Sequence, residues 1–174
     1  MSQASILPPL TQIPPYLQTV ADYERQAQLH LSDMVWQYLQ GGAMDEVSVR
    51  SNVSKFDHIQ LMPRLLQDLT HGHTECEIFG QRYPHPIFVA PIGHQQQFHP
   101  EAEAATALAA EVLGSNMVLS TFTNTDMRAL NADNPRKWFQ LYWQGERSKS
   151  LDLVKMAEAH NYSAIVVTVD SPHT

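Results

Sequence analysis

Polar or strand-breaking residues stand at the carboxyl ends of four short apolar runs in the second half of this 174-residue chain. The runs are IFVA, MVLS, WFQLY and AIVVTVD, and the residues at their ends are Pro91, Ser120, Gln140, Tyr142, Thr168 and Asp170. Uncharged amide and hydroxyl groups both donate and accept hydrogen bonds, which suits recognition of a polar small molecule. Because ligands bind at the rim formed by the carboxyl ends of the strands in a parallel α/β barrel, we expect these residues to share a site.

The elements that position these residues alternate between strand and helix patterns. Strands are expected to begin near residues 87, 117, 138 and 164, and helices are expected over residues 100–114, 123–134 and 148–160. Pro100 occupies the first position of the first helix, with Glu101 and Glu103 in its first turn, and Gly114 ends it. Asn124 or Thr125 is expected to cap the second helix.

The intervals between these strands are too long for hairpins and right for right-handed strand–helix–strand crossovers. We therefore expect an α/β fold, the N-terminal half of a (β/α)8 barrel with strands one to four. An open doubly wound sheet fits the same alternation, but that fold usually carries a glycine-rich turn after its first strand. The turn here, at residues 91–95, has one glycine and no phosphate-cradling pattern.

The chain before the periodic section divides into an arm and a helical region. Residues 1–18 hold four of the eleven prolines and are expected to form an extended arm. Residues 19–85 are expected to hold two helices within 20–40, the second capped by Ser32 or Asp33, and another helix after Asp45. A hairpin around Gly80-Gln81 would plug the bottom of a barrel, and residues 86–174 form the half-barrel itself.

Composition excludes several kinds of partner. The formal net charge of −7 and pI near 5.6 favour neither nucleic acid nor an anionic membrane, so a small molecule is expected. The single cysteine, the lack of a signal peptide and the lack of a membrane span indicate a cytoplasmic protein. Although the chain has nine histidines, the spacing His71-x-His73 and the pair His94 and His99 lack a zinc signature, and no metal is expected.

Six motifs together resemble the FMN-dependent α-hydroxy-acid oxidase/dehydrogenase family, which includes the glycolate and lactate oxidases. They are YLQGGAMDE, NVSKFDHIQLMPRLLQD, HPIFVAPIG, HPEAEAATALAAEVLG, WFQLYWQGERS and AIVVTVDSP. The resemblance runs from about Val20 to the last residue and covers only the N-terminal half of the family fold, through the fourth strand.

The resemblance implies FMN as cofactor and assigns residues to it. Pro91, Ile92 and Gly93 match the segment whose main chain packs against the flavin ring, with Ile92 in place of the usual threonine. The side chains that match those bonding the polar edge of the ring are Ser120, Gln140 and Thr168. Without the resemblance, Ser and Thr at strand ends cap helices, and Gln140 is a satisfied inward-facing amide.

The resemblance also assigns residues to the substrate. Tyr38 matches the tyrosine whose hydroxyl binds the substrate carboxylate, Tyr142 matches one that touches the substrate or stabilises charge near it, and Asp170 matches a nearby acid. Without the resemblance, Tyr38 is interpreted as a core residue and Asp170 as the cap of a helix or turn. Phe122 stands where many relatives carry tryptophan and is expected to widen the substrate pocket.

The implied reaction is FMN-dependent oxidation of a small (S)-2-hydroxy acid, lactate-like or glycolate-like, to the 2-oxo acid by the complete protein. The histidine base, the arginine clamp and the lysine beside the flavin belong to the later half of the family fold, so residues 1–174 alone are expected to have little activity. The expected partner is a complementary C-terminal half, or further copies of the chain if the protein is complete. The alternatives are a non-catalytic half-barrel remnant or assembly partner, and a different barrel or nucleotide-binding enzyme.

Overall fold

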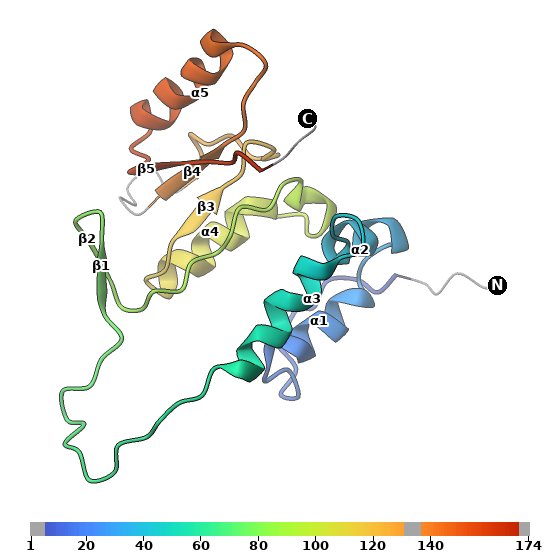
Figure 1. The fold of residues 1–174 in the computed structure, drawn as a ribbon. Helices are drawn as coiled ribbons and strands as arrows, with labels where there is room; N and C mark the ends of the chain where they lie inside the picture. Colours follow the sequence, from blue (N-terminus) through green and yellow to red (C-terminus); the bar gives the residue numbers. More distant parts are fainter. Residues whose placement is uncertain (1–5, 131–136, 171–174) are drawn as a thin grey trace. The chain divides into compact units, whose positions relative to one another are not determined.

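The computed structural model describes residues 6–130 and 137–170. These fall into two compact units, Met1–Leu69 and Thr70–Thr174 (Figure 1). Over the described residues, no helix combines the length and apolar character needed to cross a bilayer.

The first unit is helical. Its elements are α1 (Val20–Gln28), α2 (Asp33–Gln40), α3 (Val47–Ser54) and the short 3-10 helix η1 (Lys55–His58). The hydroxyl of Thr19 and the carboxylate of Asp22 form a reciprocal capping box at the start of α1, and Ser32 caps α2. The two helices expected within residues 20–40 and the helix expected after Asp45 are therefore confirmed. Residues 6–18 contain no helix or strand, as their proline pairs predict.

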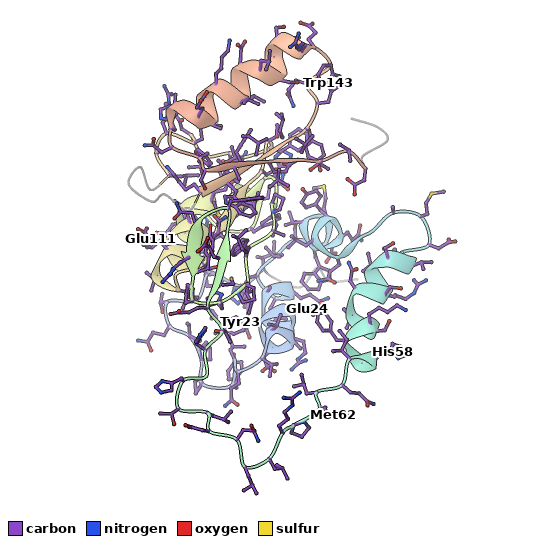
Figure 2. The ribbon with its side chains drawn as sticks, turned by 60° about the vertical axis from the view of Figure 1, so that its left-hand side comes forward. Tyr23, Glu24, His58, Met62, Glu111 and Trp143 are labelled. Carbon is purple, nitrogen blue, oxygen red and sulfur yellow. The ribbon has the colours of Figure 1, made fainter. Side chains whose placement is uncertain are left out.

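An extended stretch, residues 59–75, follows η1 and contains neither helix nor strand. Figure 2 shows Met62 on this stretch. Large apolar side chains along it are exposed, namely Ile59, Leu61, Met62, Leu65, Leu66 and Leu69.

The second unit opens with the expected hairpin, in which β1 (Cys76–Ile78) pairs antiparallel with β2 (Gln81–Tyr83). Its two turn residues, Phe79 and Gly80, have φ of 50° and 73°. A two-residue hairpin turn with positive φ at both central positions has a backbone twist that matches the right-handed twist of the flanking strands. Glycine adopts a positive φ without steric cost.

A parallel sheet follows, in the order β3 (Met117–Leu119), β4 (Lys137–Leu141) and β5 (Ala164–Val167). Helix α5 (Arg147–Ala159) connects β4 to β5, and Figure 1 shows it lying along the sheet. In the register, Leu119 pairs with Phe139 and Gln140 pairs with Val166. Sequential parallel strands joined by a helix confirm the expected crossover at this position.

The two faces of this sheet differ because successive side chains point to opposite sides. The helix-covered face contributes Met117, Leu119, Phe139 and Leu141 to the core, which is completed by side chains from the helices and the loop after β3: Ala107, Ala110, Met127, Leu130 and Ala157. The other face carries Trp138 and Gln140 from β4. The hairpin packs on this second face at its amino end, where the rings of Phe79 and Trp138 are 5.5 Å apart and those of Tyr83 and Phe88 are 4.7 Å apart.

Helix α4 (Ala102–Val112) ends as expected, with Gly114 at φ 65° and a backbone hydrogen bond from Ser115 N–H to Ala110 O of 2.8 Å. Its start differs from the expectation that Pro100 is its first residue. The chain passes through a left-handed conformation at Ala102, with φ of 45°, so the turn that contains Pro100 is not continuous with the helix.

One further expected element is present only in part, and another is wrong. The strand at residues 87–90 is reduced to a single parallel bridge between Val89 and Met117, because Pro86 and Pro91 flank it and remove ladder donors. The helix expected over residues 123–134 is absent from its described part, residues 123–130, and the remainder lies outside the described residues. The Thr123 hydroxyl donates to Thr125 O and accepts from Thr125 N–H, each at 3.0 Å, which offers the backbone a turn instead of a helix.

Candidate functional site

Three polar side chains at the carboxyl ends of β3, β4 and β5 form one hydrogen-bonded row, which we call the polar row: Ser120, Gln140 and Thr168. The Ser120 hydroxyl donates to Gln140 Oε1 at 3.4 Å. The Gln140 Nε2 group donates to the Thr168 hydroxyl at 2.8 Å. The side chains predicted from three separate strand ends are therefore brought together by the sheet.

The polar row lies on the sheet face opposite the helices. Gln140 stands between Phe139 and Leu141, whose side chains enter the core, so the alternation of the strand turns its amide the other way. Gln140 is 1% exposed and Ser120 is 4% exposed. Because buried polar groups cost free energy unless they are hydrogen-bonded, the mutual bonds of the row are part of what stabilises these strand ends.

Thr121 is the residue of this site that sequence reasoning missed. Its hydroxyl donates to Gln140 O at 2.6 Å and accepts from Tyr142 N–H at 3.0 Å. Its backbone N–H donates to Gln140 Oε1 at 3.1 Å. The only signal in the sequence is a second hydroxyl residue directly after Ser120, which does not identify a partner 19 residues away.

The segment Pro91, Ile92 and Gly93 follows the Val89 bridge and is anchored from two sides. His94 N–H donates to Phe122 O at 2.9 Å, which joins the segment to the loop after β3. The side chain of Gln95, a buried residue also missed by sequence reasoning, donates to Ile92 O at 3.4 Å and accepts from the Thr106 hydroxyl at 2.7 Å. Gly93 itself is buried, whereas Pro91 and Ile92 are exposed.

Aromatic rings stack along the same edge of the sheet. The ring of Phe122 lies 5.8 Å from that of His94, nearly parallel, and 5.2 Å from that of Tyr142. Tyr142 is half-buried and Asp170 is exposed. No hydrogen bond joins the Tyr142 hydroxyl to Asp170 in the described part of the chain.

Tyr38 belongs to the other compact unit, where it lies on α2 and is 53% exposed. A side chain exposed to this degree is not a core residue of its unit, so the alternative reading of Tyr38 as a packing residue is not supported.

The sequence profile described as FMN-dependent dehydrogenase matches residues 27–174. The chain belongs to this family. An L-lactate oxidase from Alicycliphilus denitrificans is 42% identical over 94% of this chain and 45% of its own length. A 4-hydroxymandelate oxidase from Amycolatopsis orientalis is 40% identical over 88% of this chain and 43% of its own length. 2-Hydroxyacid oxidase 1 from Homo sapiens is 33% identical over 91% of this chain and 44% of its own length.

A crystal structure of mandelate oxidase matches this member of the FMN-dependent dehydrogenase family with a TM-score of 0.83 and 41% identity. The match covers 87% of this chain and 44% of that chain. The fold is thus the first half of a (β/α)8 barrel, as expected, and the open doubly wound alternative is excluded. The chain spans under half the length of the curated relatives it matches.

The family's cofactor is FMN, and the residues at the strand ends fit it chemically. The polar edge of an isoalloxazine ring alternates donors and acceptors, and the polar row offers amide and hydroxyl groups without a formal charge. The buried, side-chain-free Gly93 suits a planar ring that must approach the main chain closely.

Glu103 is a buried charge that fixes the loop after β3. It is 0% exposed, and its carboxylate accepts from Asn124 N–H at 3.2 Å and from the Thr125 hydroxyl at 2.7 Å. Burial alone, the largest single influence, would raise the pKa of this carboxyl, but the combined hydrogen bonds from Thr125, Asn124 and Thr123 hold the pKa below its ordinary value. Glu103 is therefore an ionised anchor between α4 and the loop that carries Phe122.

Metal ligands do not gather in the described part of the chain: no group of three or more His, Cys, Asp or Glu side chains is placed to hold an ion. His71, His73 and His99 are exposed, and His94 stacks on Phe122.

Proposed function

We propose that this chain is the FMN-binding N-terminal half of an enzyme that oxidises a small (S)-2-hydroxy acid, lactate-like or glycolate-like, to the 2-oxo acid. The observation that carries the proposal is the polar row, because it joins Ser120, Gln140 and Thr168 from three adjacent strand ends. Relatives that are lactate, 4-hydroxymandelate and glycolate oxidases support the substrate class.

In this proposal the polar row holds the polar edge of the flavin, and Pro91, Ile92 and Gly93 hold its central ring with their main chain. The bonds of His94 N–H and the Gln95 side chain keep that main chain in place. Bound FMN supplies the electron acceptor for the oxidation.

On the substrate side, we assign Tyr38 to the carboxylate of the acid, since a phenol hydroxyl donates to an anion at neutral pH. Tyr142 is assigned to contact with the substrate or to stabilisation of charge near it. Asp170 is assigned as a nearby acid that biases the Tyr142 proton. Phe122 packs between His94 and Tyr142 and so forms a fixed apolar boundary beside the reacting groups.

The remaining machinery belongs to a complementary half. The resemblance implies that the histidine base, the arginine clamp and the lysine near the flavin lie on later strands, and the chain matches only 45% of the length of its lactate oxidase relative. We therefore propose that residues 1–174 alone have little activity. We also propose that the complete enzyme forms homo-oligomers and is located in the cytoplasm.

Co-production with the C-terminal half of the Alicycliphilus denitrificans L-lactate oxidase tests the function. We expect a yellow complex whose oxidised-flavin absorbance is bleached by L-lactate without oxygen. Gln140→Leu in the same complex is expected to lower the bound flavin while assembly continues. A complex that assembles but stays colourless at saturating FMN contradicts the proposal and favours a non-catalytic assembly partner.

A further inference from the structure

The hydroxyl of Thr121 continues the ladder between β3 and β4 beyond the last paired residues. Backbone pairing of the two strands ends at Leu119 and Phe139. Two residues beyond Leu119, the Thr121 hydroxyl takes the place of a backbone N–H and C=O in the ladder, because it donates to Gln140 O at 2.6 Å and accepts from Tyr142 N–H at 3.0 Å. The ends of β3 and β4 are thereby joined next to the polar row.

The main chain of Thr121 also decides which way the Gln140 amide points. A backbone N–H can only donate, so the Gln140 atom 3.1 Å from Thr121 N must be the acceptor Oε1. The Ser120 hydroxyl donates to the same oxygen. Nε2 is consequently turned toward β5, where it donates to the Thr168 hydroxyl.

The hydrogen bonds of the polar row therefore run in one direction, from β3 to β5. The Thr168 oxygen accepts from Gln140, and none of the described residues accepts the Thr168 hydroxyl proton. The row ends in hydrogen-bond donors: the Thr168 O–H and the second N–H of Gln140 Nε2.

We propose that Thr121 is a positioning residue: its hydroxyl holds its own main chain against the end of β4, and its N–H, held there, orients the Gln140 amide so that the polar row presents donors to acceptor atoms of the bound ring. The identity of that ring rests on the proposed function, whereas the orientation of Gln140 is a property of the chain without FMN. The corresponding ligand atoms are carbonyl oxygens or unprotonated ring nitrogens.

Amide exchange and side-chain NMR of the 174-residue chain without FMN test the positioning role. Thr121→Val keeps the shape but removes the hydroxyl, so we expect Tyr142 N–H to exchange roughly tenfold faster, as loss of about one hydrogen bond predicts. Thr121→Ser is expected to restore slow exchange. Thr123→Val, which removes a hydroxyl from the same loop that does not touch β4, is expected to leave Tyr142 exchange unchanged.

The unsubstituted chain provides a second measurement that does not depend on the folding of a variant. We expect nuclear Overhauser contacts from the Gln140 side-chain NH2 that are stronger to the Thr168 methyl group than to the Thr121 amide proton. The reverse pattern, or unchanged Tyr142 exchange in Thr121→Val, overturns the positioning role.

Flavin titration of the complemented protein separates this inference from the proposed function. We expect the dissociation constant for FMN to rise roughly tenfold in Thr121→Val and to stay within about twofold in Thr121→Ser. Wild-type protein that fails to bind FMN contradicts the proposed function but leaves the NMR result on Gln140 standing. Equal FMN affinity of Thr121→Val and wild type contradicts the inference alone.

Discussion

At the scale of single residues, Gln140 is the centre of the site because its side chain bonds to the ends of both neighbouring strands. Its side-chain oxygen accepts hydrogen bonds from Thr121 and Ser120 at the end of β3, and its side-chain nitrogen donates one to Thr168 after β5. A side chain with this many partners cannot be replaced without leaving donors unpaired, which gives it a structural role before any ligand binds.

Gln140→Leu tests that role. Leucine has a similar size but no hydrogen-bonding group, so the Thr121 N–H loses its partner inside the protein. We expect the free energy of unfolding, measured by urea denaturation, to fall by about 1–3 kcal/mol. Gln96→Leu, at an exposed glutamine of η2 (Gln95–Gln97), is the matched control and is expected to change it by less than about 0.5 kcal/mol. Equal losses of unfolding free energy in Gln140→Leu and Gln96→Leu would argue against a stabilising role for the hydrogen bonds of the polar row.

Glu103→Gln tests the buried carboxylate. We expect it to lower the free energy of unfolding at pH 7 by about 1–3 kcal/mol, because hydrogen bonds to a charged acceptor are stronger than those to an amide. The folded-state pKa of Glu103 is below the ordinary value of 4.5, so its stabilisation is present above that pH and is lost as the pH falls through the folded pKa.

The measurement for Glu103 is urea unfolding at a series of pH values. Wild-type stability is expected to fall as the pH drops below about 4.5, and Glu103→Gln is expected to show a smaller fall over the same range. Glu101→Gln, at an exposed carboxylate two residues away, provides the control. Parallel curves for wild type and Glu103→Gln would show that this carboxylate is not the anchor.

Sequence reasoning found the residues whose position follows from strand ends and missed those whose role depends on a distant partner. Ser120, Gln140 and Thr168 were predicted to meet because each follows an apolar run, and the sheet brings them together. Thr121 and Glu103 were not recognised in their roles, because their partners are groups about 20 residues away that only the folded sheet selects. The cofactor and substrate roles themselves came from the family resemblance and remain predictions for each residue.

At the scale of elements, strands and helices were predictable where periodicity was long and uninterrupted. α5 and β3 to β5 lie where the pattern placed them, whereas residues 87–90 and 123–130 do not form the predicted elements. In both failures local chemistry opposes the pattern, through flanking prolines in one and hydroxyl-to-backbone bonds in the other. The hairpin was predictable because Gly80 meets the geometric demand of its turn.

Gly80→Ala tests the need for a positive φ at the hairpin turn separately from side-chain packing. A Cβ added at Gly80 would meet no atom within 4 Å, so any cost comes from the backbone at φ 73°. We expect a loss of about 1–2 kcal/mol in the free energy of unfolding by urea, and a smaller loss for Gly80→Asn, because asparagine tolerates this conformation better. A neutral Gly80→Ala would mean that the hairpin has adopted a different turn.

At the scale of the whole molecule, many large apolar side chains of the described residues are exposed to solvent. Val167, the last residue of β5, and Val169, two residues after it, are both exposed. The extended stretch of residues 59–75 is similarly apolar and exposed. Since large exposed apolar patches mark interaction sites, the complementary half proposed above is expected to cover part of this surface.

Limited trypsin digestion tests this expectation. Arg64 is exposed and lies in the extended stretch without helix or strand, so we expect the first cut of the isolated chain to follow it. Arg64→Gln is expected to remove that cut, and assembly with the complementary half is expected to slow it. A first cut elsewhere, for example within α5, would indicate that the stretch is protected in the isolated chain.

The register of the three parallel strands has a geometric consequence for the site. Ser120 and Gln140 are level across β3 and β4. On β5 the partner of Gln140 is Val166, and Thr168 lies two residues beyond it. Over the two steps from β3 to β5, the row therefore shifts by two residues, which is an average stagger of one residue per strand. A cylinder of eight tilted strands has a shear of about eight, which is the same stagger. The polar row consequently follows a circumference of that cylinder, so a flat molecule held by it spans the mouth and lies across the strands.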